Sequence, residues 1–314
     1  MRRGGLLAVL AALACALPRP LAAETLKIAS PIRGSWEGAI PELGQQAGIF
    51  RKHGLDLDIL YTQGGGETMQ VVVSGAVDIG LSAGMLGSLG AYGKGAPVRI
   101  VGASSTGSRE TFWWVPARSP LRSIREVNGQ TIAYSTTGAS SHITVLHFIS
   151  EYRLNARPVA TGDVPATITQ VMSGQVDIGW SVAPFVLDLL EKGEARMIGR
   201  ASDVPTVLGQ TIRVQIINAA NLAAKKETVA RYLKAYDETV DWMYASPEAV
   251  PRYLAFSGLS EPAVRRMLKE FIPKESLQTG RIMGIEESMK DAVQFKFLSA
   301  PLSAAQLKEL IQIP

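Results

Sequence analysis

The pattern Ser-Gly-Xaa-Val-Asp-Ile-Gly-Xaa-Ser occurs twice in this chain, at residues 74–82 and again at 173–181. Ser-Gly is typical of a helix end, because glycine readily adopts the left-handed conformation that caps a helix. Val-Asp-Ile then predicts a short buried strand, and the second glycine allows a tight turn at its carboxyl end. A chain with two such turns is expected to fold into two similar halves. We interpret the turn itself as structural and the residues that follow it as candidate site residues.

The segments before the two copies predict the same order of elements: strand, polar loop, helix, strand and short helix. The expected strands cover residues 26–29, 55–61, 130–134 and 157–161. A helix is expected between each pair of strands, from Trp36 to Gly54 in the first half and from Ser140 to Leu154 in the second. Repeats of this kind form parallel α/β units. The expected fold class is therefore α/β, with two lobes built alike and a helical C-terminal part.

The first 23 residues have the features of a secretory signal peptide. Arg2 and Arg3 precede an apolar run at 6–17, and the sequence Leu-Ala-Ala at 21–23 forms a small-residue cleavage site. The apolar run is too short to span a bilayer. A lipoprotein leader that uses Cys15 is the second interpretation, since the leucine of the usual lipoprotein pattern is one position off. We therefore expect cleavage after residue 23 and export of the rest of the chain to the periplasm.

The charge balance argues against a nucleic-acid-binding role. The chain has 32 basic and 28 acidic residues, and the expected leader contains three of the arginines and no acidic residue. Cleavage leaves 29 basic residues against 28 acidic ones, whereas a nucleic-acid-binding face needs a clear excess of Lys and Arg. The only cysteine, Cys15, lies in the leader. The exported chain is therefore expected to have no disulfide and no cysteine ligand for a metal.

Several features together resemble the periplasmic substrate-binding proteins of ABC importers. They are the leader, the glycine-bearing loop after the first strand, the two copies of the repeated turn, and two further segments. The segments are Gly48-Ile49-Phe50 followed by His53-Gly54-Leu55, and Arg125-Glu126-Val127-Asn128-Gly129-Gln130-Thr131-Ile132-Ala133. The group that the chain resembles most includes binders of aliphatic sulfonates, taurine, nitrate and thiamine precursors.

The resemblance implies a two-lobed type II periplasmic binding protein fold. In this fold two crossing strands join the lobes, which close on a ligand by a hinge motion. The implied division of the chain is a signal peptide at 1–23, a first lobe at 24–117, an inserted second lobe at 118–211, and a return to the first lobe with C-terminal helices at 212–314. The resemblance also implies a monomer that binds a small molecule, without cofactor or metal, and delivers it to an ABC permease in the inner membrane.

Each lobe is expected to contribute the loop after its first strand and the turn after the repeated motif, since ligands bind at the carboxyl ends of parallel strands. In the second lobe a helix is expected to start near Ser140, and its free N–H groups suit an anionic oxygen. Ser and Thr are also common as plain helix caps, which is the alternative for this segment. The candidate ligand-binding residues are Arg33, Ser35, Trp36, Ser82, Thr137, Gly138, Ala139, Ser140 and Trp180.

The charge of the ligand stays open at this point. Arg33 and the helix N-termini favour an anion such as a sulfonate, and this is our first hypothesis. Three acidic residues favour an amine instead, and four aromatic residues are suited to enclosing a pyrimidine ring. The acidic residues are Glu37, Glu67 and Asp163, and the aromatic residues are Trp36, Trp180, Tyr61 and Tyr134.

An enzyme is the first alternative to a binding protein, because thiamine-pyrimidine synthases share this fold. Resemblance to them implies a cysteine-rich iron-binding stretch, which the residues after Cys15 do not contain. His142 and His147 are five positions apart, whereas metal-binding pairs on a helix prefer a spacing of four. We therefore expect that the chain is not an enzyme. A sensor, in which a similar pair of lobes signals to a membrane receptor, is the second alternative.

Overall fold

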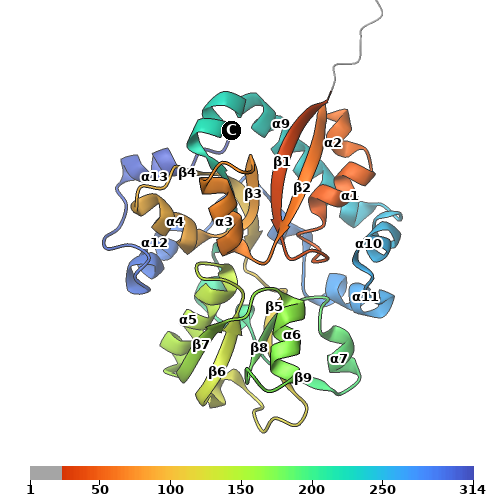
Figure 1. The fold of residues 1–314 in the computed structure, drawn as a ribbon, viewed down its shortest axis with the longest axis vertical. Coiled ribbons are helices and arrows are strands. Elements are labelled where there is room, and N and C mark those ends of the chain that lie inside the picture. The colour runs from red at the N-terminus through yellow and green to blue at the C-terminus, as the bar shows by residue number, and fades with distance from the viewer. Residues whose placement is uncertain (1–22) are drawn as a thin grey trace, which may run out of the picture.

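The computed structural model describes residues 23–314. The predicted signal peptide at 1–23 lies outside the described residues, except for its last residue. The described chain forms two lobes, one above the other in Figure 1. One lobe contains a five-stranded sheet, and the other contains a three-stranded and a two-stranded sheet. The α/β class with a helical C-terminal part, predicted from the sequence, is confirmed.

The first sheet combines the predicted parallel unit with a returning antiparallel strand. Its strands are β1 (Glu24–Pro31), β2 (Leu55–Thr62), β3 (Ile79–Gly84), β4 (Val98–Thr106) and β10 (Thr211–Asn218), in the order β2-β1-β3-β10-β4. β1 runs parallel to β2 and β3, with Ile28 opposite both Ile59 and Ile79. β10 lies antiparallel between β3 and β4, because the chain enters this sheet through β10 after it leaves the second lobe.

The second lobe contains the inserted strands. They are β5 (Thr111–Pro116), β6 (Asn128–Tyr134), β7 (Asn155–Ala160), β8 (Gly179–Val182) and β9 (Ala195–Arg200). β6 runs parallel to β7, as predicted, whereas β5 pairs antiparallel with β8 and β9. Residues 111–116 therefore pair with strands of the second lobe, although the expected bounds place residues up to 117 in the first. The division of the chain into domains otherwise stays a prediction.

Helices cover the sheets of both lobes (Figure 1). In the first lobe they are α1 (Ile40–Gln46), α2 (Ile49–Lys52), α3 (Gly65–Val73) and α4 (Met85–Gly93), and in the second α5 (Ser140–Tyr152), α6 (Val164–Met172), α7 (Leu187–Glu191) and α8 (Pro205–Leu208). The single helix expected from Trp36 to Gly54 is two short helices, α1 and α2. Gly48 separates them with a φ of 75°, a left-handed conformation that interrupts a regular helix.

The repeated turn ends a helix, as inferred from the sequence, but the predicted Val-Asp-Ile strands are wrong. The strands β3 and β8 begin at Ile79 and Gly179, so the second glycine of each copy lies in a strand and not at a turn after it. Gly75 and Gly174 cap α3 and α6 with φ values of 77° and 81°. Asp78 accepts a hydrogen bond from the backbone N–H of Lys27 at 3.0 Å, and Asp177 accepts the corresponding bond from Thr131 at 2.8 Å. Each aspartate therefore joins its turn to a parallel strand of its own lobe, β1 or β6, and neither lines the cavity between the lobes.

The C-terminal helices contact both lobes. They are α9 (Ala219–Ala245), α10 (Ala249–Ser257), α11 (Glu261–Glu270), α12 (Ile285–Gln294) and α13 (Ala304–Leu310). In α12, Asp291 lies 3.2 Å from Nε2 of His147 in α5. At the start of α11, the hydroxyl of Ser260 donates a 2.7 Å hydrogen bond to Asp188 in α7. The C-terminal part therefore also contacts the second lobe.

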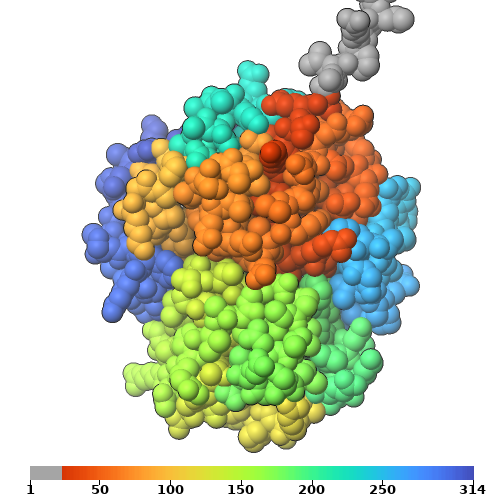
Figure 2. Space-filling model, viewed as in Figure 1, coloured from red at the N-terminus to blue at the C-terminus, as the bar shows by residue number. Residues whose placement is uncertain are grey.

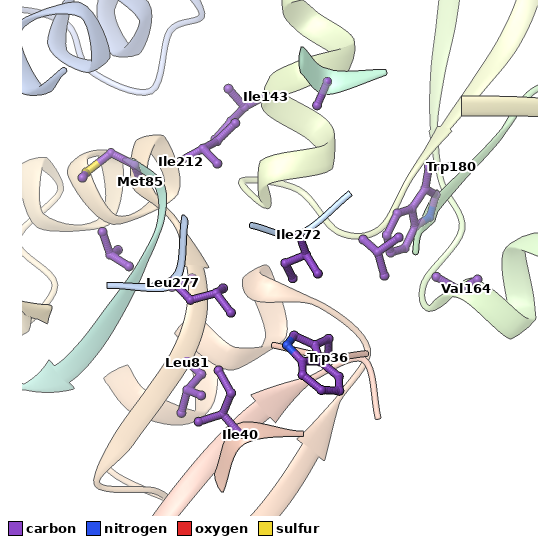
Figure 3. Packing of buried hydrophobic residues seen from close by; sticks show 14 of the residues in the cluster. Trp36, Ile40, Leu81, Met85, Ile143, Val164, Trp180, Ile212, Ile272 and Leu277 are labelled. Carbon is purple, nitrogen blue, oxygen red and sulfur yellow. The ribbon is translucent and has the colours of Figure 1, made fainter. Parts of the chain in front are cut away.

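One continuous cluster of buried apolar side chains extends across the two lobes. Figure 3 shows Trp36 and Leu81 from the first lobe, Trp180 and Val164 from the second, and Ile272 from the C-terminal part around the same region. The boundary between the lobes is therefore packed with apolar side chains. Within residues 23–314, no helix is long and apolar enough to cross a membrane.

Candidate ligand-binding cleft between the lobes

A cavity lies between the two lobes and is lined by residues of both. Its volume is about 30 Å³, close to the share of one water molecule in the liquid. Pockets for organic ligands usually measure roughly 300–1,000 Å³. Figure 2 shows atoms of the two lobes in contact along their boundary on the visible face. In this structure the lobes are therefore in contact around the cavity, and the cavity is smaller than a pocket for an organic ligand.

Most of the predicted ligand-binding residues line this cavity. The six that do are Ser35, Trp36, Ser82, Ala139, Ser140 and Trp180. They come from the loops after β1 and β6 and from strands β3 and β8. This is the location expected for a site at the carboxyl ends of parallel strands.

The other three predicted residues, Arg33, Thr137 and Gly138, are not among the residues that line the cavity. Arg33 is exposed, and its guanidinium carbon lies 4.8 Å from the centre of the Phe256 ring, a cation–π contact. Thr137 and Gly138 face glycines of the first lobe: a Cβ atom on Gly66 would lie 2.6 Å from the carbonyl oxygen of Thr137. Their role as ligand contacts stays a prediction.

Two helices from different lobes begin at the cavity. The N-cap of α3 is Gly64 and that of α5 is Ala139, and neither has a side-chain hydrogen bond that caps its helix. Gly65, Ala139 and Ser140 line the cavity. Because the first turn of a helix has N–H groups without intrahelical partners and carries a partial positive charge, both helix ends suit an anionic or hydrogen-bond-accepting group.

The backbone is strained where the first lobe meets the cavity. Ile32 and Ser82 line it with φ values of 57° and 54°, and the left-handed conformation is a genuine outlier for a β-branched residue such as Ile32. Such strain concentrates at functional sites. At Ser82 the conformation accompanies a contact, because its hydroxyl donates a 2.5 Å hydrogen bond to Oε1 of Glu37.

Glu37, Glu110 and Arg213 form a buried ionic triad in the cavity wall. Nη1 of Arg213 lies 3.2 Å from Oε2 of Glu37, and Nη2 of Arg213 contacts Oε1 of Glu110. Glu110 and Arg213 were not among the predicted site residues. The available sequence signal was a single arginine inside the otherwise uncharged strand at 211–218. The triad joins the first lobe to both segments where the chain crosses between the lobes.

Three polar atoms in the cavity wall have no hydrogen-bond partner in the described part of the chain. They are Oε2 of Glu110, Nε1 of Trp36 and Nε of Arg213. Trp36 is fully buried and packs edge-on against Tyr253, with ring centres 4.8 Å apart. Nε1 of Trp180, in contrast, donates a 3.1 Å hydrogen bond to the hydroxyl of Thr161. Buried polar groups usually have partners, so these unpartnered atoms are candidate positions for ligand groups.

The charges at the cavity differ from those expected. Of the three acidic residues proposed to meet an amine, only Glu37 lines the cavity, because Asp163 caps α6 and Glu67 accepts from the N–H of Gln63. Arg33, which was predicted to bind an anion, does not line the cavity, whereas Arg213 does. The cavity wall therefore has two carboxylates and one guanidinium.

His142 supports the loop that leads into α5. Burial lowers the pKa of His142 to about 4, so the imidazole is neutral near pH 7. Its Nδ1 accepts a 3.2 Å hydrogen bond from the N–H of Gly138, and its ring packs on Tyr134 with centres 4.3 Å apart. Within the described range 23–314, no group of three or more His, Cys, Asp or Glu residues is placed to hold a metal ion.

Comparison with known proteins gives enzymes among the relatives in sequence. The chain is 24% identical over 226 residues to the 4-amino-5-hydroxymethyl-2-methylpyrimidine phosphate synthase THI5 of Saccharomyces cerevisiae, with 68% of this chain and 66% of the yeast protein covered. It is 23% identical over 240 residues to the synthase of the same name from Aspergillus parasiticus, with 73% and 69% covered. The chain thus spans just under two thirds of the yeast relative.

Comparison with solved structures gives binding proteins. The alkanesulfonate-binding protein SsuA from Xanthomonas axonopodis, bound to MOPS, superposes with a TM-score of 0.78 at 18% identity, over 92% of this chain and 98% of that one. The periplasmic aliphatic sulphonate binding protein SsuA from Escherichia coli gives a TM-score of 0.71 at 17% identity, over 93% and 92%. At these identities the likeness establishes the periplasmic binding protein fold.

These comparisons correct one expectation and confirm another. The expectation that the chain is not an enzyme is contradicted, because its curated relatives are named as synthases. The resemblance to the family is confirmed by the fold of the solved structures and by a family model that matches residues 42–250. That match covers more than half of the chain, which therefore belongs to the NMT1/THI5-like family.

Proposed function

We propose that this chain is an extracytoplasmic solute-binding protein, which captures a small organic ligand between its lobes and delivers it to the permease of an ABC importer. The observation that carries this proposal is the cavity whose wall is contributed by both lobes. A site divided in this way forms only when the lobes come together. Ligand binding is therefore coupled to closure, and closure gives a permease a surface to recognise.

Contacts between glycines of the first lobe and the loop before α5 support this coupling. The backbone N–H of Gly66, in the first lobe, donates a 2.9 Å hydrogen bond to the hydroxyl of Thr136 in the second. Beside it, the carbonyl oxygen of Gly138 lies so close to Gly84 and Gly87 that a side chain at either glycine would collide with it. Glycines on the first lobe thus let the two backbones meet.

The ligand is proposed to contain an anionic, sulfonate-like group that sits at the N-terminal turns of α3 and α5. The N-cap residue of neither helix forms a side-chain capping bond, although the N–H of Gly66 in α3 already donates to Thr136. The remaining N–H groups at a helix start bind anionic oxygens well. The structural neighbours named as sulfonate-binding proteins are consistent with this choice. The predicted signal peptide supports a periplasmic location, and the protein is proposed to act there as a monomer.

A pyrimidine or related aromatic ligand is the second candidate. Trp36 and Trp180 line the cavity from different lobes, as Figure 3 illustrates, and two flat apolar side chains suit an aromatic ring. The names of the curated relatives contain a substituted pyrimidine. A non-transport sensor uses the same closure and is distinguished by a receptor in place of a permease.

Thermal unfolding with a ligand panel tests the proposed function. Residues 24–314 are heated with alkyl sulfonates, taurine, nitrate, aromatic carboxylates or pyrimidines at about 1 mM. A ligand with micromolar affinity then adds about 4 kcal/mol to the free energy of unfolding, which raises Tm by several degrees in a chain of this length. A shift with sulfonates supports the first candidate, and a shift with pyrimidines alone supports the second. The absence of any shift would contradict solute binding by this cleft.

A further inference from the structure

We infer that the ligand of this cleft carries a cationic or N–H-donating group, which pairs with the carboxylate of Glu110. This inference rests on the proposed solute-binding function and narrows the chemical class of the solute. With an anionic group at the helix ends, the ligand is a dipolar molecule, such as an amino sulfonate or an amino acid. A neutral amino-substituted ring offers the same N–H donors.

The first step is that both terminal nitrogens of the Arg213 guanidinium are already engaged. Its Nη1 lies 3.2 Å from Oε2 of Glu37, and its Nη2 contacts Oε1 of Glu110. Nη2 also donates to the hydroxyl of Ser105 at 3.1 Å. Both terminal nitrogens are therefore occupied, and only Nε of Arg213 has no partner among residues 23–314. The two carboxylates exceed the charge of this guanidinium by one.

The second step identifies the one carboxylate oxygen of the triad that is free. Both oxygens of Glu37 are engaged, Oε1 by the hydroxyl of Ser82 and Oε2 by Arg213. Oε1 of Glu110 receives Arg213 and, at 3.3 Å, the hydroxyl of Thr111. Oε2 of Glu110 has no partner among residues 23–314, although Glu110 is only 4% exposed and lines the cavity.

The third step is energetic. A buried carboxylate without full compensation is costly, because it has lost its hydration and gained too few partners. A donor on the ligand supplies the missing partner at Oε2 of Glu110. A fully charged ammonium also removes the surplus negative charge, so it should bind more tightly than a neutral N–H group. Charge-assisted hydrogen bonds of this kind are the stronger class.

The fourth step concerns location. Glu110 precedes β5, where the chain first crosses into the second lobe, and Arg213 lies in β10, where the chain returns. The free oxygen is therefore beside the crossing segments, whereas the starts of α3 and α5 belong to separate lobes. A ligand that spans these positions has its donor at the crossing segments and its acceptor at the helix ends. Such a ligand contacts both lobes and also the segments at which the chain crosses between them.

The test uses pairs of ligands that differ in one amino group. Dissociation constants are measured by calorimetry for taurine against ethanesulfonate, 3-aminopropionate against propionate, and 4-aminopyrimidine against pyrimidine. We expect the amino member to bind at least tenfold more tightly in one or more of these pairs. The first two pairs probe an ammonium, and the third probes a neutral donor.

The variant Glu110→Gln assigns the preference to this residue. Glutamine keeps the shape of the side chain and removes its charge, so the preference for the amino member should fall to less than threefold. The matched control Glu126→Gln, at an exposed glutamate of the second lobe, should keep the full preference. A preference that persists in Glu110→Gln overturns the assignment to this carboxylate.

The unmodified protein decides the ligand class even if the variant does not fold. Equal or tighter binding of the members without an amino group overturns the inference and leaves the proposed solute-binding function intact. Binding of none of the six compounds, together with no Tm shift in the wider panel, overturns both. These two failures are therefore distinguishable.

Discussion

The backbone N–H of Gly66 and the hydroxyl of Thr136, seventy positions apart, form a 2.9 Å hydrogen bond that joins the two lobes. It is the polar part of a contact in which glycines of the first lobe approach the backbone of residues 136–138. Glycine lacks the Cβ atom that would hold two backbones apart. The contact between the lobes therefore depends on glycines, which leave room for the backbone of residues 136–138.

Substitution of Gly66 by alanine is predicted to weaken ligand binding. Its Cβ atom would lie 2.6 Å from the carbonyl oxygen of Thr137, so the lobes cannot close fully. We expect a loss of affinity of roughly tenfold or more, because a ligand binds in proportion to the population of the competent state, with Tm of the free protein nearly unchanged. Gly280→Ala is the matched control, since a Cβ there meets nothing within 4 Å. Unchanged affinity in Gly66→Ala would show that closure is not needed.

Removal of Arg213 is predicted to destabilise the fold. Arg213→Met leaves Glu37 and Glu110 buried together without a cation, a change that typically costs about 3–5 kcal/mol. The control Arg51→Met breaks an exposed pair with Asp56, and exposed pairs contribute less than about 1 kcal/mol. Chemical denaturation of both variants measures the difference. Equal stability of the two variants would contradict the description of the triad as an ionic network in the buried wall.

Trp180 is predicted to be important for stability as well as for the cleft. Its side chain is 1% exposed, so Trp180→Ala should lower the free energy of unfolding by about 3–5 kcal/mol. Leu60→Ala is the control, because Leu60 is 46% exposed and surface changes usually stay within about 0.5 kcal/mol. A Trp180→Ala variant with unchanged Tm would mean that the ring packs less tightly than described.

The repeated turn made the architecture predictable. Its two glycines adopt the left-handed conformation, and the loops and strands around them bring Ser35, Ser82 and Ser140 to one cavity. The directions of β5 and β10 were not predictable, because alternation of apolar residues marks a strand but not its direction. Both run antiparallel to their neighbours because they are the first strands after each crossing.

The charged part of the site could not be read from the sequence. Glu110 and Arg213 are more than a hundred residues apart and meet only because the chain crosses twice between the lobes. Arg33 lies in the predicted loop, but its side chain turns to Phe256, a residue of the C-terminal part. Local sequence therefore identified the loops of the cleft, whereas long-range pairing determines which charges enter it.

The stability of the protein is predicted to fall between about pH 6.5 and pH 4 because of His142. Burial lowers the pKa of this side chain to about 4 in the folded state, whereas an unfolded histidine titrates near 6.5. Above about pH 6.5 the imidazole is neutral in both the folded and the unfolded state. Protonation of His142 therefore does not change the free energy of unfolding in this range. As the pH falls, the unfolded chain takes up a proton that the folded chain does not, so the unfolded state is favoured.

The size of this effect is on the order of 2–3 kcal/mol near pH 4, measured as the decrease in unfolding free energy from pH 7. His142→Asn keeps an acceptor for the N–H of Gly138, which His142 now binds at 3.2 Å, but does not titrate, so it should lose this part of the pH dependence. His53→Asn, at a histidine paired with Glu238 outside the cleft, should retain it. If His142→Asn and the unmodified protein lose stability in parallel, another group is responsible. Protonation of His142 below about pH 4 removes the acceptor for the N–H of Gly138 and loosens the loop before α5. We therefore expect ligand affinity to decrease in the same pH range.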